Sequence, residues 1–335
     1  MTSGAREIKL PVAAEIVWRA LVAPGRRDWY YGLAPEGAFV EGGQIRWVDG
    51  GGRVAVEDEV VAMTPPRHLA LQTRFLFAPI FAALPPHQAR WDVAPAPSGC
   101  RVRTSWQANE PLARLLESDA DGLLQALRLA LDPAAQAEIA RKESIGEVTV
   151  RDVTPDRVED YLAFFDHEAF RDFPQWRFCY CMETHRTQSE DEWALRTGHD
   201  NRRDMSAMIA KREVSGLLAY ADGKPIGWCN YGATTNLSGV MHRFGLEAAD
   251  HDGVGSIACF VIAAPYRAHG VATRLLDTAV ERLRGKGLRA VEAYPWRTDA
   301  TSAQLHYRGP LSMFLRAGFE PYRETDRYVV VRKNL

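Results

Sequence analysis

Hydrophobic and polar residues alternate in short stretches through the first third of the chain, and paired glycines or prolines separate the stretches. Alternation of this kind predicts half-buried β-strands. The strand candidates are 7–12, 44–48, 53–63, 68–77, 89–95 and 100–108. A helix candidate lies early, at 13–22, and another follows at 121–131, where leucines form one apolar stripe. We therefore expect an antiparallel sheet with a long helix at its C-terminal end.

The pattern changes after an alanine-rich junction at about 131–147, where a proline ends the preceding helix. From there on, strand candidates alternate with helix candidates. The run 255–263 is almost continuously apolar and predicts a strand buried on both faces. The helix candidate 270–287 carries apolar residues at helical spacing. We predict an α+β / α/β protein of two domains, 1–140 and 145–335, the second with a mixed sheet and flanking helices.

Length, charge and cysteine content narrow the functional classes. A chain of 335 residues exceeds the size at which a single hydrophobic core usually stops growing, which agrees with two domains. The formal net charge of −2 gives no electrostatic argument for binding nucleic acid. No apolar run suits a signal peptide or a membrane span. The odd number of five cysteines favours reduced thiols, so we expect a cytoplasmic protein.

The stretch "APYRAHGVATRLL", residues 264–276, carries the strongest local signal. Its R-x-x-G-x-A spacing stands directly between the apolar run and the helix candidate. The first N–H groups of a helix have no intrahelical acceptor and the helix dipole is positive there, so such a turn suits a phosphate. Gly270 lets a phosphate approach the backbone, and Ala272 keeps the next turn small. The spacing matches neither a Walker loop nor a dinucleotide-binding glycine pattern.

In this context the chain from about 147 to 335 resembles the GNAT acetyltransferase superfamily. The resemblance rests on the apolar strand, the loop, the helix after it and a late Gly318-Phe319 pair. It implies acetyl-CoA as the acetyl donor, with its pyrophosphate bound by backbone amides of the loop. The residues at those positions are Arg267, Ala268, His269, Gly270, Val271, Ala272 and Thr273. It also implies that Ile262 and Ala264 pair with the pantetheine arm.

Residues 1–140 resemble the START-like (SRPBCC) superfamily in the order of their elements and in a Pro65-Pro66 turn. That family has a helix-grip fold, which implies a hydrophobic cavity between sheet and helix and an apolar ligand inside it. The aromatic residues that could line such a cavity are Trp29, Tyr30, Trp47, Phe75, Trp91 and Trp106. The simpler interpretation of each is an ordinary core position.

The GNAT resemblance implies that an amine attacks the thioester directly, without a covalent enzyme intermediate. Members often place a proton-donating tyrosine in the short helix before the Gly-Phe pair, where this chain has Phe314. Tyr307 is the nearest phenol and the candidate acid, with a structural role as its alternative. Glu292 interrupts an otherwise apolar strand, so it is either the candidate base or half of a buried salt bridge. Water is a further candidate for carrying the proton away.

Four cysteines lie in the second domain. Cys179 and Cys181 share the segment "FCYCMETH" with His185, and Cys229 and Cys259 lie on neighbouring strand candidates. We expect buried or pocket-lining thiols, of which two or three can converge near the acceptor site. Zinc sites usually use C-x2–4-C pairs, so the C-x-C spacing argues against a metal and none is expected.

The leading interpretation is an acetyl-CoA-dependent N-acetyltransferase acting on a small-molecule amine. One alternative is a binding module, a ligand sensor whose second domain only reports acetyl-CoA. Another is a protein-lysine acetyltransferase regulated by a ligand in the first domain. The loops on the acceptor side are polar and mixed in charge, so they indicate no acceptor class. The sequence leaves the oligomeric state open and predicts no nucleic-acid or membrane partner.

Overall fold

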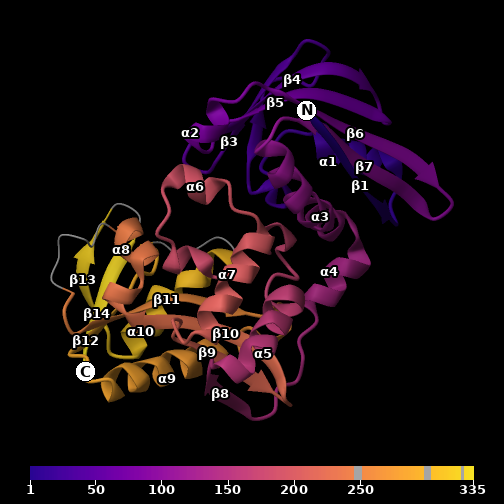
Figure 1. Ribbon diagram of the computed structural model, residues 1–335. Helices are drawn as coiled ribbons and strands as arrows, with labels where there is room; N and C mark the ends of the chain where they lie inside the picture. Colours follow the sequence, from indigo (N-terminus) through magenta and orange to yellow (C-terminus); the bar gives the residue numbers. More distant parts are fainter. Residues whose placement is uncertain (245–250, 298–302, 326–327) are drawn as a thin grey trace. The chain divides into compact units, whose positions relative to one another are not determined.

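The computed structural model describes residues 1–244, 251–297, 303–325 and 328–335, without the side chains of 303–305. The chain forms two compact units, each with its own seven-stranded sheet (Figure 1). Unit 1 comprises Met1–Ile139, Asp172–Phe178 and Gln188–Asp200, and unit 2 comprises Ala140–Arg171, Cys179–Thr187 and Asn201–Leu335. Unit 1 thus includes two stretches that the sequence analysis assigned to the second domain. The predicted α+β architecture with an antiparallel and a mixed sheet is confirmed.

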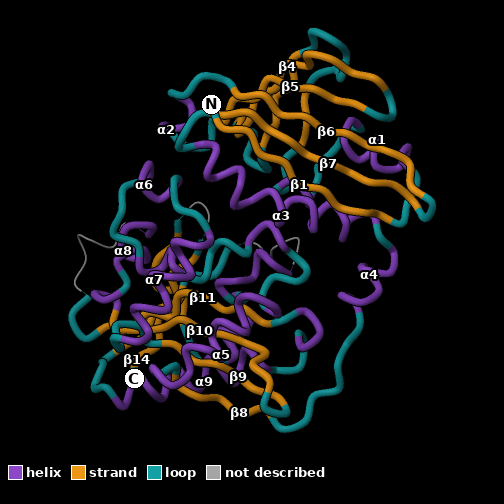
Figure 2. The backbone as a smooth tube through the Cα atoms, turned by 45° about the vertical axis from the view of Figure 1, so that its right-hand side comes forward, coloured by secondary structure: helices purple, strands orange, loops and turns teal. Residues whose placement is uncertain are grey.

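Unit 1 is an antiparallel sheet in the order β1-β7-β6-β5-β4-β3-β2. Its strands are β1 Thr2–Leu10, β2 Ala34–Glu36, β3 Gln44–Val48, β4 Val54–Thr64, β5 His68–Phe75, β6 His87–Ala96 and β7 Gly99–Ala108. Its helices are α1 Ala14–Val22, α2 Pro79–Ala82, α3 Leu112–Leu131, α4 Pro133–Ala140 and α6 Glu190–Ala194. Helix α3 packs along β1 and β7 (Figure 2). It begins at Leu112, before the leucine stripe at 121–131 from which the helix was predicted.

The aromatic residues of unit 1 pack largely against one another. The ring centroids of Trp29 and Trp91 are 6.1 Å apart, and those of Tyr30 and Trp47 are 4.7 Å apart. Trp106 belongs to a separate apolar cluster with Phe81. Such ring contacts are what a filled core provides, so they favour the simpler interpretation of these residues. The apolar ligand and the START-like resemblance stay predictions.

One carboxyl group lies inside this core. Asp58 is 2% exposed and accepts hydrogen bonds from Trp47 Nε1 at 2.7 Å and Thr73 Oγ1 at 2.5 Å. Burial outweighs both hydrogen bonds and raises the pKa of Asp58 to about 6. The folded state therefore holds this proton more tightly than the unfolded chain does. The stability that this bound proton gives the folded state is lost as the pH rises from the pKa of Asp58 in the unfolded chain through its pKa in the folded state.

We expect Asp58→Asn to unfold at a higher temperature than the wild type at pH 8, with a smaller difference at pH 5. A shift of about two pKa units corresponds to roughly 3 kcal/mol. The asparagine amide keeps one acceptor for Trp47 and gains a donor for Thr73. Buried His87, whose pKa is lowered to about 4 by burial, changes stability in the opposite direction with pH. Because His87 is present in both proteins, the variant-minus-wild-type difference in thermal unfolding isolates Asp58. A variant less stable than wild type at pH 8 contradicts the prediction.

Unit 2 is a mixed sheet in the order β13-β14-β12-β11-β10-β9-β8, in which only β11 and β12 run parallel as neighbours. Its strands are β8 Val148–Asp152, β9 Gly216–Ala221, β10 Lys224–Ala233, β11 Val254–Ile262, β12 Ala290–Ala293, β13 Glu320–Glu324 and β14 Val329–Asn334. Its helices are α5 Val158–Ala163, α7 Gly198–Ala210, α8 Ser238–Phe244, α9 Val271–Gly285 and α10 Leu311–Arg316. Among the described residues, no helix has the length and apolar character to cross a membrane.

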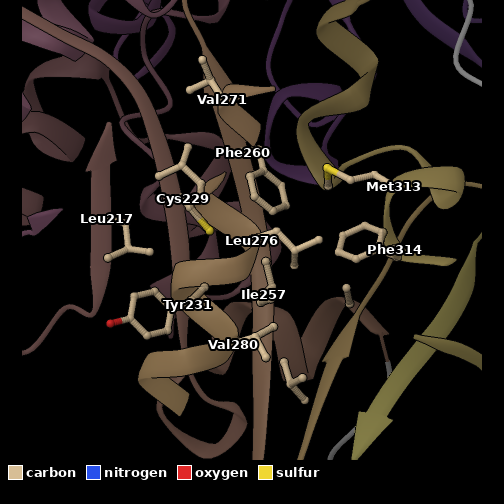
Figure 3. Packing of buried hydrophobic residues seen from close by; sticks show 14 of the residues in the cluster. Leu217, Cys229, Tyr231, Ile257, Phe260, Val271, Leu276, Val280, Met313 and Phe314 are labelled. Carbon is tan, nitrogen blue, oxygen red and sulfur yellow. The ribbon is translucent and has the colours of Figure 1, made fainter. Parts of the chain in front are cut away.

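Helix α9 packs on the sheet through the face that the sequence pattern predicts. Leu275, Ala279 and Leu283 are fully buried there. Side chains of β10, β11 and α10 complete the same apolar cluster, which includes Cys229 and Phe314 (Figure 3). This packing fixes the N-terminus of α9 directly after β11.

Candidate active site

The loop between β11 and α9 makes its turn with two residues in the left-handed region. Ala268 has φ 70° and Gly270 has φ 76°. Of the residues that the structure describes, none accepts a hydrogen bond from the N–H groups of 269–273. The space where a Gly270 side chain would begin is open to at least 4 Å. Free N–H groups, a positive helix end and open space form an anion-binding arrangement.

Strand β11 loses one of its two neighbours midway. It pairs with β12 only from Val254 to Ile257. On its other side the register with β10 shifts so that Ala258 has no partner of its own, which makes it a β-bulge. Residues 259–262 therefore pair with β10 alone, and among the described residues no strand pairs with their edge toward β12. An extended ligand can add to such an edge through backbone hydrogen bonds.

Of the two residues predicted to pair with pantetheine, Ile262 is the last residue of β11, whereas Ala264 begins the 3₁₀ helix Ala264–Tyr266. The carbonyl of Ile262 accepts a hydrogen bond from Arg267 Nε at 2.8 Å. The carbonyl of Ala264 accepts one from Lys142 Nζ at 3.2 Å. The arginine of the R-x-x-G-x-A pattern therefore ties the loop back to the strand.

The residues around the predicted acid lie on two different elements. Phe314 belongs to α10, is fully buried, and packs on Phe260 and Phe319 at centroid distances of 6.2 and 5.3 Å. Tyr307 belongs to the short 3₁₀ helix Ala303–Arg308, so the candidate acid and Phe314 lie on separate elements. Gly309 and Pro310 separate the two elements. The Tyr307 hydroxyl lies 3.5 Å from Arg243 Nη1.

Glu292 has a partner. It is 1% exposed, and its Oε1 accepts from Arg332 Nε at 2.9 Å. The Tyr294 hydroxyl lies 3.4 Å from Oε2 of the same carboxylate. Both carboxylate oxygens thus have partners inside the sheet, and this geometry favours the salt-bridge alternative over a general base.

The four cysteines do not all converge. Cys181 and Cys259 lie within hydrogen-bonding reach of each other, and Cys179 is close to both. Cys229 points into the apolar cluster under α9 (Figure 3). His185 is buried and makes its contact elsewhere, with Asn230 Nδ2 at 2.8 Å. In the described part of the chain, no three potential metal ligands form a group that could hold an ion.

Two side chains stand out that the sequence analysis did not single out. The indole N–H of Trp228 is buried without a hydrogen-bond acceptor. Arg308 is 5% exposed, and its guanidinium lies over four aromatic rings, the nearest Trp296 at 4.5 Å and Phe244 at 4.6 Å. Neither residue had a local sequence signal, because both environments are made by distant segments.

Comparison with known proteins finds a family match in the C-terminal half. Residues 170–308 match the model of the acetyltransferase (GNAT) family. This match agrees with the GNAT resemblance stated for the chain from about 147 to 335. No curated protein matches the chain.

Solved structures are also similar to parts of the chain. The PaiA N-acetyltransferase of Thermoplasma acidophilum, in complex with coenzyme A, is 15% identical, covers 57% of this chain and 100% of its own, and has a TM-score of 0.36. A GNAT acetyltransferase of Streptococcus pneumoniae is 15% identical over 56% of this chain and 99% of its own, with a TM-score of 0.34. The Aha1 dimer of Colwellia psychrerythraea is 16% identical over 40% of this chain and 98% of its own, with a TM-score of 0.32.

Proposed function

We propose that the protein is an acetyl-CoA-dependent N-acetyltransferase. The observation that carries the proposal is the loop before α9, where no described residue accepts a hydrogen bond from the N–H groups of 269–273. The loop follows the part of β11 that has no strand partner on the β12 side among the described residues. The loop takes the pyrophosphate, with backbone groups of Arg267 to Thr273 as its donors. The edge at Ile262 and Ala264 takes the pantetheine arm. The match of residues 170–308 to the GNAT family supports this use of the loop.

Acetyl transfer requires a neutral amine near the thioester, a donor to the developing oxyanion and a proton for the leaving thiolate. The family resemblance implies direct attack by the amine. The acceptor in this proposal is a small-molecule amine. A ligand sensor and a protein-lysine acetyltransferase are the alternatives, and the cytoplasmic location stays a prediction.

A thiol-release assay on the full chain tests the proposal. Acetyl-CoA is incubated with a panel of small amines and, separately, with lysine-containing peptides. Release of free CoA that depends on a small amine supports the proposed activity. Coenzyme binding without any amine-dependent release identifies a sensor, and release with peptides alone identifies a protein acetyltransferase.

We expect Tyr307→Phe to lower kcat by about 10²-fold while acetyl-CoA affinity changes little, because one general acid is lost. The Tyr307 hydroxyl lies 3.5 Å from Arg243 Nη1. Steady-state kinetics and calorimetry measure the two quantities. Phe314→Tyr, added to the Tyr307→Phe variant, is the matched control. The ring of Phe314 lies in the apolar cluster, so the added hydroxyl should not restore kcat. Full activity of Tyr307→Phe would make the phenol structural and leave water as the donor.

A further inference from the structure

One guanidinium group of unit 2, that of Arg308, is buried among aromatic side chains. Its Cζ lies over four rings, at centroid distances of 4.5 Å for Trp296, 4.6 Å for Phe244, 5.3 Å for Tyr307 and 5.8 Å for Tyr328. The first of these rings follows β12, the second ends α8, the third precedes Arg308 itself and the fourth directly precedes β14. We call these four side chains the ring cluster.

The ring cluster is tied into the sheet of unit 2. Trp296 and Tyr328 pair in an isolated β-bridge. The ring of Phe244 meets Tyr328 edge-on at 4.5 Å and stacks on buried Tyr294 at 4.3 Å. The Tyr294 hydroxyl in turn lies 2.6 Å from Oγ of Ser256 in β11. The cluster therefore has a fixed place beside β11.

The rings satisfy only part of what Arg308 requires. An aromatic face attracts a cation, but guanidinium N–H groups lie in the plane of the group and need an acceptor such as oxygen. Nη1 of Arg308 is buried without a hydrogen-bond partner, and Arg308 forms no ion pair with any residue that the structure describes. Buried charges in proteins are normally paired. The arrangement therefore has a buried donor to which an acceptor can be added.

A second arginine lies near the ring cluster, and it already has a carboxylate partner. Nη1 of Arg243 lies 3.5 Å from the Tyr307 hydroxyl, and the same guanidinium pairs with Glu183. Burial lowers the pKa of Arg243, and the charge of Arg308 acts in the same direction. Within the described part of the chain, Glu183 thus compensates Arg243 and leaves Arg308 without a counter-ion. An anion bound to Arg308 would balance its charge.

The position of Arg308 connects this donor with the proposed reaction. Arg308 follows Tyr307, the candidate acid, in the 3₁₀ helix Ala303–Arg308, and that helix contacts β11. The proposed path of the pantetheine arm follows the edge of β11 at 259–262. The attacking amine has to meet the thioester near the group that gives its proton to the leaving thiolate. An acceptor whose amine lies near Tyr307 therefore has its other groups within reach of Arg308.

We propose that Arg308 binds a carboxylate of the acetyl acceptor, so that the acceptor is an amine that also carries a carboxylate, as an amino acid does. The inference rests on the proposed function. A guanidinium binds a planar carboxylate through two parallel N–H bonds, and the surrounding rings hold the guanidinium in place for this geometry. Because the pair forms in a buried setting, it is stronger than in water. Arg308 determines specificity in this role and takes no part in the acetyl transfer itself.

The first arm of the test compares acceptors on the wild-type full chain. Release of free CoA from acetyl-CoA is measured with a panel of amino acids, each beside its carboxamide and its aminophosphonate analogue. We expect kcat/KM of at least one amino acid to exceed that of its carboxamide by about 10²-fold or more, because the carboxamide leaves buried donors of Arg308 unpaired. A preference for the aminophosphonate over the amino acid overturns the assignment to a carboxylate.

The second arm uses variants of the arginine. Arg308→Met keeps apolar bulk among the rings and removes the charge, so the ratio of kcat/KM between amino acid and carboxamide should fall to about 1. Arg308→Lys keeps the charge without the two parallel donors and should show an intermediate ratio. Both acceptors are measured on one preparation, so the ratio does not depend on the fraction of folded protein. Affinity for acetyl-CoA, measured by calorimetry, should be preserved in both variants.

Arg323→Met is the matched control. Arg323 is an exposed arginine whose Nη2 donates to the carbonyl of Phe244 at 3.4 Å, and its removal should leave the ratio unchanged. A wild type that acetylates amines without preferring the carboxylate, or a preference that survives in Arg308→Met, overturns the inference and leaves the proposed function intact. A protein that binds no acetyl-CoA, or transfers acetyl to no amine, contradicts the proposed function and the inference with it.

Discussion

Gly270→Glu abolishes binding of acetyl-CoA in calorimetry on the full chain. The new side chain starts in the open space above the N-terminus of α9, where the proposed pyrophosphate site lies. It adds a negative charge where the free N–H groups would otherwise meet the phosphates, and its carboxylate can occupy those donors itself. The φ of 76° adds backbone strain, because only glycine adopts it at little cost.

The same helix offers a control for that strain. Gly287, just beyond the end of α9, also has φ 76° and also has nothing within 4 Å of the position of a side chain. Gly287→Glu therefore carries a similar backbone cost and the same charge, yet should bind acetyl-CoA normally. Gly270→Ala, which adds strain without charge, should weaken binding less than Gly270→Glu. Equal affinities of the wild type and Gly270→Glu would refute the coenzyme site.

Arg332→Ala lowers the free energy of unfolding by about 3–5 kcal/mol, the usual cost of leaving one member of a buried ion pair alone. The Glu292 carboxylate is 1% exposed and would lose its charged partner. Chemical denaturation measures the loss. Arg282→Ala is the control, since Arg282 pairs with Asp152 at 2.9 Å where both side chains are largely solvated, and should cost less than about 1 kcal/mol. A loss for Arg332→Ala no larger than that control's would contradict the prediction.

Glu292→Gln distinguishes the two roles that the sequence left open. If Glu292 only pairs with Arg332, the folded variant keeps its kcat although it is less stable. If Glu292 is the base, kcat falls about 10²-fold or more in molecules that remain folded. Activity per folded molecule, measured well below the unfolding temperature, separates the two.

The local sequence pattern was sufficient to predict the strands of unit 1, helix α9 and the loop that precedes α9. The strands of unit 1 and helix α9 depend on alternation and on apolar residues at helical spacing, which a sequence displays directly. The turn at Gly270 was also readable, because the run of apolar residues, the glycine and the helix stand next to one another in the chain. The family match at 170–308 agrees with that interpretation.

The sequence by itself determined the two architectures and the glycine turn before α9, because these follow from residues that are neighbours along the chain. Only the tertiary structure decided the chemistry around them. It paired Glu292 with Arg332 across two strands and buried Phe314 in the apolar cluster. Charge, burial and hydrogen bonding act through space, so the protonation states of these groups depend on contacts between segments that are distant in the chain.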